Sequence, residues 1–342
     1  MARGAMLSFR LGLSDGVSVV ARLWQDLLTG IGFDMVTVAA EGPVDRVVPG
    51  LGIDQPDGPD PDALAAAVAD VDLVVVENLC TIPLNLAAAR TVARTLAGRP
   101  AILHHHDPPW QRERFAAVTE LPPRDPAWRH VVINRLTADQ FAQRDIEATV
   151  IYNGFDTHGP NGDRSAMRAA LGVDDPTLLV VHPVRAIARK NIPAAIAVTE
   201  QLGGTYWLMG HAEEGYDATL AQLLAEARCP VIHRPVARTP DIYAAADLVV
   251  FPSTWEGFGN PPVEAAVWGR PCVVGDYPVA GELAEFGFRW FSPDRLDEVR
   301  RFLESPDPEL LSQNRAIAQQ HFSLDRVRSD LVALLADAGW LP

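Results

Sequence analysis

The chain has 342 residues, of which 48% are hydrophobic and 21% are charged, a composition typical of globular proteins with sizeable cores. Its length suggests two domains. The formal net charge is −15, from 29 basic and 44 acidic residues. This argues against nucleic acid as a partner, because phosphate backbones bind basic surfaces.

The cysteines and the apolar runs indicate the compartment. Cys80, Cys229 and Cys272 lie far apart and without metal-ligand spacing, which is typical of reduced thiols in the cytoplasm. No run reaches the roughly 18 apolar residues that span a bilayer. We therefore expect a cytoplasmic protein with no transmembrane segment.

Short β-branched runs alternate with longer amphipathic runs, a pattern typical of βαβ units in a parallel sheet. In the first half of the chain the pattern predicts strands at residues 6–13, 35–39, 73–77, 101–106, 130–134 and 149–152. Helices are predicted between them, notably at 17–30 and 83–97. The segment 55–62, dense in proline, glycine and aspartate, is predicted to be a loop.

The second half repeats this rhythm after a predicted linker, residues 153–175, which is rich in Gly, Asn, Asp and Pro. Strands are predicted at 178–182, 206–209, 231–233, 248–252 and 272–275. Helices are predicted at 192–202, 216–228, 240–246 and 261–268, and the tail from Pro293 is mostly helical. The pattern predicts two doubly wound α/β domains facing each other across a cleft, with ligands at the carboxyl ends of the strands.

The segment 251–270, FPSTWEGFGNPPVEAAVWGR, is the most informative motif. A strand is followed by Gly257 and Gly259, which let the backbone pass close to a ligand, and then by a helix whose positive end suits a phosphate. Glu256 and Glu264 bracket this turn. Beside an anion, carboxylates make sense if they accept hydrogen bonds from hydroxyls of the same ligand. The alternative is that both acids only stabilise the helix N-terminus.

A second motif follows the first strand of the second half. Arg185, Arg189 and Lys190 lie in one predicted strand-end loop, where fixed cations could neutralise a departing diphosphate. Lys190 is the only lysine among 29 basic residues. A merely solvated loop is the alternative, but an arginine would serve there equally well.

Together these motifs resemble the retaining glycosyltransferases of family 4, also called glycosyl transferases group 1, which have the GT-B fold of two Rossmann-like domains. The resemblance covers nearly the whole chain. It is carried by EGFGNPPVE at 256–264, RAIARK at 185–190, NGFD at 153–156 and YAAADLVVFPSTWEGFG at 243–259.

The resemblance implies roles for individual residues. Arg185 and Lys190 would bind the donor diphosphate, and Glu264 would bind the ribose hydroxyls. Glu256 would position the donor sugar, together with the turn formed by Gly257, Phe258, Gly259 and Asn260. Val236 would lie near the nucleotide base, and Gly16 would contact the donor from the first strand–helix loop.

Residues 102–107, ILHHHD, form the candidate site of the first half. Alternation along a strand sends His104 and His106 to one face and His105 to the other, so the three cannot all bind one zinc ion. The resemblance places a histidine at this strand end beside the donor sugar, and we assign it to His106, with His105 as the rival. Trp110 and Arg112 are predicted to line the acceptor side, although Trp110 could equally be a packing residue.

We therefore expect a retaining, metal-independent hexosyltransferase that needs no cofactor. It would move a sugar from a nucleoside diphosphate sugar to a hydroxyl of a small-molecule, glycan or lipid-linked acceptor, in the interdomain cleft. Residues 1–156 would form the acceptor-side domain, with the last helix, at about 323–342, packing back on it, and residues 157–322 the donor-binding domain. The alternatives are a GT-B-fold epimerase or phosphorylase, a non-catalytic nucleotide-sugar-binding protein and, least favoured, a histidine metalloenzyme.

Overall fold

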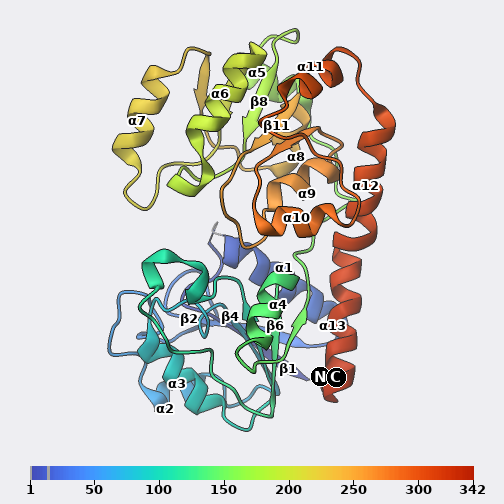
Figure 1. The fold of residues 1–342 in the computed structure, drawn as a ribbon. Coiled ribbons are helices and arrows are strands. Elements are labelled where there is room, and N and C mark those ends of the chain that lie inside the picture. The colour runs from blue at the N-terminus through green and yellow to red at the C-terminus, as the bar shows by residue number, and fades with distance from the viewer. Residues whose placement is uncertain (1, 14–15) are drawn as a thin grey trace. The chain divides into compact units, whose positions relative to one another are not determined.

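The computed structural model describes residues 2–13 and 16–342. The chain divides into two compact units, shown as ribbons in Figure 1. Unit 1 comprises residues 1–154 and 324–342, and unit 2 comprises residues 155–323. Each unit is built around one parallel sheet, so the predicted pair of parallel-sheet α/β domains is confirmed.

The sheet of unit 1 has the strand order β3-β2-β1-β4-β5-β6-β7. Its strands are β1 (Arg3–Leu7), β2 (Asp34–Ala39), β3 (Arg46–Val47), β4 (Leu73–Glu77), β5 (Ala101–His105), β6 (Trp128–Val132) and β7 (Ala148–Val150). The order reverses between β1 and β4, and a crevice for ligands forms where the carboxyl ends of two such strands diverge.

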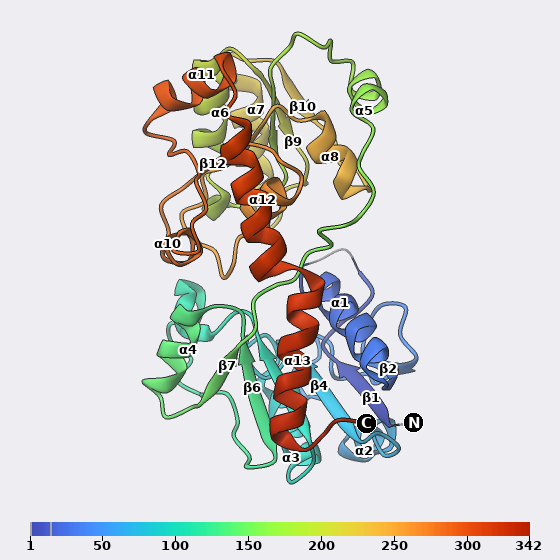
Figure 2. The same ribbon diagram turned by 90° about the vertical axis from the view of Figure 1, so that its right-hand side faces the viewer.

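Helices cover both faces of this sheet, which explains why its central strands are apolar on both sides. In β4, Leu73 and Val75 pack with α1 and α13, whereas Val74 and Val76 pack with α2 and α3. Figure 2 shows α13 lying against this sheet with α1 beside it. The helices of unit 1 are α1 (Gly16–Ile31), α2 (Pro61–Ala67), α3 (Leu86–Leu96), α4 (Arg135–Ala142) and α13 (Leu324–Ala338), with the 3₁₀ turns η1 (Pro109–Gln111) and η2 (Glu113–Phe115).

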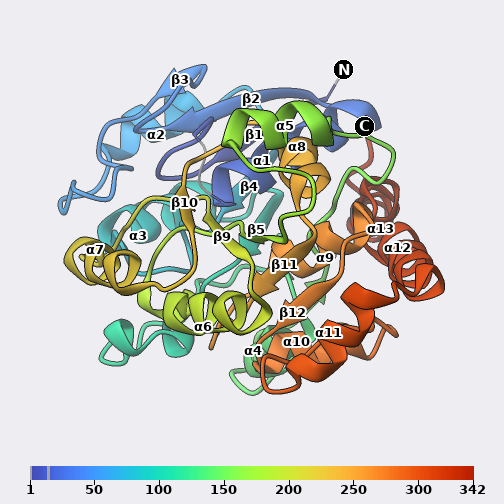
Figure 3. The same ribbon diagram turned by 90° about the horizontal axis from the view of Figure 1, so that it is seen from above.

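The sheet of unit 2 has the order β10-β9-β8-β11-β12, which reverses between β8 and β11. Its strands are β8 (Leu179–His182), β9 (Thr205–Leu208), β10 (Val231–His233), β11 (Leu248–Phe251) and β12 (Cys272–Val274). Because crossovers between parallel strands are right-handed, the reversal sends α6 to one face and α8 and α9 to the other, as Figure 3 shows.

The helices of unit 2 are α5 (Arg164–Leu171), α6 (Ile192–Leu202), α7 (Asp217–Glu226), α8 (Thr239–Ala245), α9 (Asn260–Val267), α10 (Pro278–Ala284), α11 (Leu296–Glu304) and α12 (Pro308–Phe322), with the 3₁₀ turn η3 (Ala188–Lys190). Proline in the first turn starts several of them, because its missing N–H costs nothing there. In α9 these prolines are Pro261 and Pro262.

Two predictions of secondary structure are wrong. The strand predicted at 6–13 ends at Leu7, and the chain turns at Gly12, which has a φ of +73°. The predicted linker contains the helix α5. Asp163 caps it by accepting a hydrogen bond from the Ala166 N–H at 2.9 Å, and Gly172 ends it in the left-handed conformation. The glycines and prolines around α5 concealed a helix of eight residues.

Acid is expected to destabilise unit 1 through His130. Burial, and secondly the charge of Arg124, lower the pKa of His130 from 6.5 to about 4. As the pH falls, the unfolded chain therefore binds this proton before the folded chain does. The contribution of His130 to the free energy of unfolding is complete above pH 6.5 and is lost as the pH falls toward 4. At pH 5 this loss is about 2 kcal/mol. The measurement is the unfolding temperature between about pH 5 and pH 8.

Two variants isolate this contribution. His130→Gln should make the loss of stability in acid smaller by this contribution, because the buried His104, His105 and His182 also have lowered pKa values and remain. His211→Gln should keep the full pH dependence, because the His211 side chain is 80% exposed. Equal slopes in the His130 variant and the unmodified protein would contradict the assignment.

Candidate functional site

Two loops meet at the carboxyl ends of β8 and β11, where the strand order of unit 2 reverses. The Thr254 N–H donates to the Arg189 carbonyl at 2.9 Å. In return the Arg189 guanidinium donates to the Trp255 carbonyl at 3.1 Å, and the Asn191 amide donates to the Pro252 carbonyl at 3.2 Å. These bonds join residues 183–191 and 252–259 into one rigid strand-end surface.

A buried charge cluster lies at this junction. Nζ of Lys190 is 2.6 Å from Oε1 of Glu256, and Arg189 forms an ion pair with Oε2 of the same carboxylate. Lys190 and Glu256 are only 9% and 5% exposed. Nζ also lies 4.9 Å from the ring centroid of Phe251, so the ring faces the cation. Two cations share one carboxylate, which leaves the cluster with a net positive charge suited to an anion.

The pKa shifts agree with this reading. Burial lowers the pKa of Lys190 to about 8, although Glu256 opposes the shift. Burial alone would raise the pKa of Glu256, but Lys190 and Arg189 outweigh it and lower that pKa below its usual value. The carboxylate is therefore ionised at neutral pH, and it holds both cations in place.

The glycine turn that follows Glu256 is fixed by a phenylalanine anchor. Phe258 is buried against Phe155 and Phe322, with ring centroids 6.2 and 6.0 Å away. Gly259 takes a φ of +92° and begins α9. Pro261 and Pro262 have no N–H, so the backbone donors near this helix start belong to residues 257–260.

Glu264 lies one turn into α9 and is partly buried. The hydroxyl of the buried Tyr243 donates to its Oε2. Burial raises the pKa of Glu264, although Tyr243 opposes the shift. The second oxygen, Oε1, makes no hydrogen bond with any residue that the structure describes, which leaves it able to accept one from a ligand.

The structure separates the two cations that were assigned to the diphosphate. Arg185 is exposed and forms an ion pair with Glu213 at 2.6 Å, whereas Arg189 is the arginine on Glu256. The charge of Arg185 reaches the cluster only through space, as a minor contribution to the lowered pKa of Lys190. Val236 lies partly buried in the loop that follows β10.

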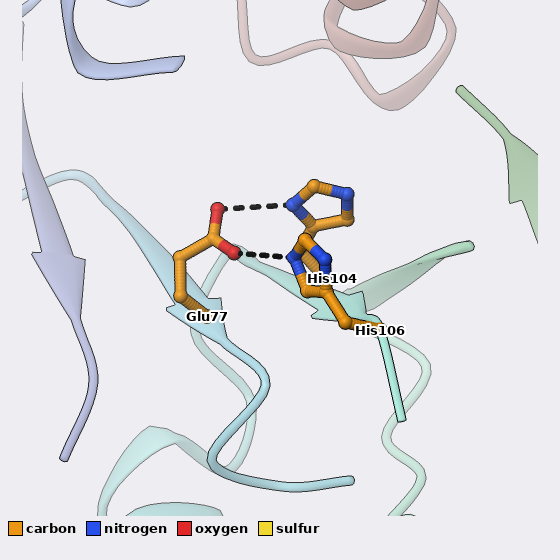
Figure 4. A group of neighbouring side chains, drawn as sticks. All are labelled: Glu77, His104 and His106. Atoms are coloured by element: carbon orange, nitrogen blue, oxygen red, sulfur yellow. Dashed lines mark hydrogen bonds and ion pairs between the residues drawn. The ribbon is translucent and has the colours of Figure 1, made fainter. Parts of the chain in front are cut away.

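In unit 1, the ends of β4 and β5 carry a second buried cluster, drawn in Figure 4. Glu77 is in register with His104 on the neighbouring strand. Its Oε1 is 2.9 Å from Nδ1 of His104, and its Oε2 is 2.9 Å from Nε2 of His106. Glu77, His104 and His106 are 0%, 1% and 7% exposed. The predicted alternation of the histidines is confirmed.

His105 faces the other side of the sheet. It is wholly buried, with Nδ1 bonded to the Thr81 hydroxyl and Nε2 2.9 Å from Nδ1 of His130. Phe141 packs against the ring at 4.8 Å between centroids. His105 and His106 therefore do not share a face.

The ligand atoms of Glu77, His104 and His106 lie within 4.8 Å of one another, so this group could hold a metal ion. The argument from the sequence, that consecutive histidines cannot converge on one ion, was incomplete. It omitted the carboxylate that the adjacent strand brings to the same face. A charged residue that ends a fully buried run, LVVVE, was the available signal.

The remaining predicted residues of unit 1 have these surroundings. Gly16 is exposed at the start of α1, while Ser14 and Asp15 of the same loop lie outside the described residues. The Trp110 indole N–H donates to Gln140 at 2.8 Å, and Arg144 lies 4.0 Å from the ring centroid of Trp110. Arg112 forms an ion pair with Asp107.

Comparison with solved structures identifies the fold class. The structure of Anabaena Alr3699/HepE in complex with UDP and glucose has a TM-score of 0.77 and 21% identity, and the match covers 98% of this chain and 100% of that one. Sucrose-phosphate synthase from Thermosynechococcus elongatus also has a TM-score of 0.77, with 14% identity over 98% and 99% of the two chains. The protein has the GT-B fold of the glycosyltransferases.

Sequence comparison finds a matching family model and related proteins. Residues 186–299 match the model of the family described as glycosyl transferases group 1. Mannosylglucosylglycerate synthase from Thermotoga maritima is 25% identical over 96% of this chain and 98% of its own length. The lipopolysaccharide core mannosyltransferase LpsB of Rhizobium meliloti is 28% identical over 48% and 52%. The predicted resemblance is confirmed, and the chain is a glycosyltransferase.

The helices of the described part of the chain were also compared with the needs of a bilayer span. None of them is both long enough and apolar enough to cross a membrane.

Proposed function

We propose that the protein is a retaining, metal-independent hexosyltransferase in which unit 2 binds a nucleoside diphosphate sugar and unit 1 binds a hydroxyl acceptor. The observation that carries the proposal is the buried Lys190–Glu256 pair at the strand-order reversal of unit 2. Ligands of open α/β sheets bind at such reversals, and a net positive, poorly hydrated cluster there suits a diphosphate.

In the proposed reaction, the bond between the anomeric carbon and the diphosphate oxygen breaks while the acceptor oxygen bonds to the same face of the sugar. The acceptor proton passes to the departing phosphate oxygen. Lys190 and Arg189 stabilise the charge that develops on the diphosphate, with Arg185 as a more distant cation. Because these side chains do the neutralising, the reaction needs no metal ion.

Further residues are assigned to the sugar, the ribose and the base of the donor, and to the acceptor. Glu256, with the backbone of residues 257–260, positions the sugar, and the unpaired oxygen of Glu264 accepts hydrogen bonds from the ribose. Val236 lies beside the base. In unit 1, His106 faces a sugar hydroxyl, Trp110 and Arg112 line the acceptor side, and Gly16 lies near the donor phosphate.

The comparisons guide the choice of substrates. A structural neighbour was solved with UDP and glucose, and again with UDP-glucose, and two relatives have mannosylated products or mannosyl transfer in their names. We therefore place UDP-glucose and nucleoside diphosphate mannoses first among the donors. Glycerate and glucosylglycerate come first among the acceptors, after the product named in the Thermotoga relative.

The experiment is a transfer assay with this panel, with EDTA present throughout. We expect a glycoside product by mass spectrometry, and proton couplings that give it the anomeric configuration of the donor. A product of opposite configuration would refute retention, and loss of turnover in EDTA that added metal restores would refute metal independence. Epimerised or merely hydrolysed donor, with no glycoside for any acceptor, would refute transfer as proposed.

A further inference from the structure

Glu77 is a buried acid that the proposed mechanism does not use. It ends β4 next to β1, where the strand order of unit 1 reverses and ligands of such sheets bind. It is wholly buried, and both carboxylate oxygens are bonded to imidazoles. Burying a carboxylate is costly, and here two histidines are used to offset that cost. Such an arrangement suggests that Glu77 has a function.

The protons of this cluster can be placed by donor and acceptor chemistry. Each oxygen of Glu77 lies 2.9 Å from one imidazole nitrogen, so the two rings face the carboxylate as hydrogen-bond donors. An ionised carboxylate only accepts hydrogen bonds. Nδ1 of His104 and Nε2 of His106 must therefore carry the hydrogens that point at Glu77.

His104 donates to one oxygen of the carboxylate. Its ring stacks on Trp24 with centroids 4.0 Å apart, and its Nε2 is buried without a partner. A second proton would leave a buried donor unsatisfied, so the ring stays neutral, and burial lowers its pKa accordingly. His104 thus holds one oxygen of Glu77, which directs the other oxygen at His106.

His106 is the last residue in this series of hydrogen bonds, and one of its ring nitrogens is left for a ligand. The Asn78 side-chain oxygen accepts from the N–H groups of His106 and Asp107, each at 3.1 Å, and so fixes the backbone at the end of β5. With Nε2 bonded to Glu77, the other ring nitrogen is Nδ1. It has no hydrogen-bond partner in the part of the chain that the structure describes, and in the neutral ring it carries a lone pair.

We propose that Glu77 is a positioning residue that locks His106 in the tautomer with its hydrogen on Nε2, so that Nδ1 accepts a hydrogen bond from a sugar hydroxyl. The identity of the ligand, a sugar hydroxyl, rests on the proposed function, whereas the tautomer of His106 does not. The hydroxyl belongs to the donor sugar or to the acceptor, and the experiment distinguishes these sources. In this tautomer the only ring donor of His106, Nε2–H, is bonded to Glu77, so Nδ1 offers no hydrogen to a ligand group that can only accept.

The tautomer is measured directly, without any substrate. In the full-length protein with ¹⁵N-labelled histidine, two-bond ¹H–¹⁵N correlations distinguish a protonated Nε2 from a protonated Nδ1. We expect protonated Nε2 for His106 in the unmodified protein. In Glu77→Gln one of the two oxygens becomes an N–H₂ donor. If it faced His104, the hydrogen of that ring would have to move to Nε2, which is buried without a partner. The amide should therefore donate to Nε2 of His106, whose hydrogen then moves to Nδ1, whereas Glu77→Asp keeps an acceptor-only group and should keep the tautomer. Thr81→Val, which alters only the His105 face, is the control and should leave His106 unchanged.

Ligand measurements then locate the hydroxyl. We expect Glu77→Gln to leave the affinity for UDP unchanged. If the donor sugar supplies the hydroxyl, the variant loses the extra affinity for UDP-glucose over UDP. If the acceptor supplies it, the variant raises KM for the acceptor instead. Either loss is expected to be roughly 10- to 100-fold, by analogy with the loss of a partner that orients a metal-binding histidine.

Three results would overturn the proposal. The first is a protonated Nδ1 of His106 in the unmodified protein, and the second is an unchanged tautomer in Glu77→Gln. The third is a stoichiometric metal ion in the purified protein that disappears in Glu77→Gln, because a metal on Nε2 would replace the hydrogen there. If the tautomers behave as expected but neither UDP nor any nucleotide sugar binds, the proposed function fails and the role of Glu77 stands.

Discussion

Lys190→Ala is expected to lower kcat by about 100-fold or more while the chain stays folded, the scale of losing one charge contact to a transition state. The side chain supplies a buried positive charge 2.6 Å from Glu256. Without it, Arg189 is the only cation among the described residues that contacts this carboxylate, and the Arg189–Glu256 pair is electrically neutral. A departing diphosphate would then meet a neutral Arg189–Glu256 pair at the junction of the two loops, with only the more distant Arg185 to offset its charge.

Matched variants separate charge from packing. Lys190→Met keeps most of the length and the contact with Phe251 but removes the charge, so we expect it to be as inactive as the alanine variant. Arg228→Ala removes a cation whose side chain is 85% exposed and should leave kcat unchanged. Near-normal turnover in a folded Lys190→Met would reject the role of the charge. The unfolding temperature and circular dichroism verify folding.

Gly259→Ala is expected to have the second large effect, on stability and on donor binding together. The backbone of Gly259 has a φ of +92°, which strains any residue with a Cβ. The new methyl would also overlap the hydroxyl of Tyr277 and lie 3.2 Å from the Phe251 ring. Both rings are buried and packed edge to face, so neither can yield cheaply. We expect a loss of about 2–4 kcal/mol and an unfolding temperature lower by roughly 5–10 °C.

Gly269→Ala provides the matched control. Gly269 also has a positive φ, of +63°, but a Cβ there would meet nothing within 4 Å. It should therefore lose only about 1 kcal/mol, the conformational contribution alone. Equal losses in the two variants would show that the contacts with Tyr277 and Phe251 do not matter. Unchanged UDP affinity in Gly259→Ala would show that the shape of the turn is not needed for the diphosphate.

The sequence allowed most strands to be predicted, because their signal is local. The run LVVVE in β4 has apolar residues on both faces of the strand. This pattern distinguishes a buried parallel strand from a strand that has one face in solvent. Errors arose where local composition competed with capping. The glycines and prolines around α5 resemble a linker, yet Asp163 and Gly172 cap a helix between them.

The candidate site was predictable in part for a related reason. Lys190 and Glu256 stood out because one is the only lysine and the other precedes a glycine turn. Their direct contact, and the ion pair of Arg189 with the same carboxylate, depend on the register of β8 with β11, which no local pattern encodes. Glu77 was missed for the same cause, since its partners His104 and His106 lie on the neighbouring strand.

The packing of α13 in unit 1 also affects the order in which the two units can finish folding. Unit 1 takes its first 154 residues from one end of the chain and α13 from the other. Val327 and Leu331 complete the core that contains Trp24. During synthesis, the part of this core formed by residues 1–154 stays exposed until unit 2 and then α13 have been synthesised. The unit that starts the chain is thus the last to finish folding, and a premature stop before residue 324 leaves its apolar face open to chaperones and proteases.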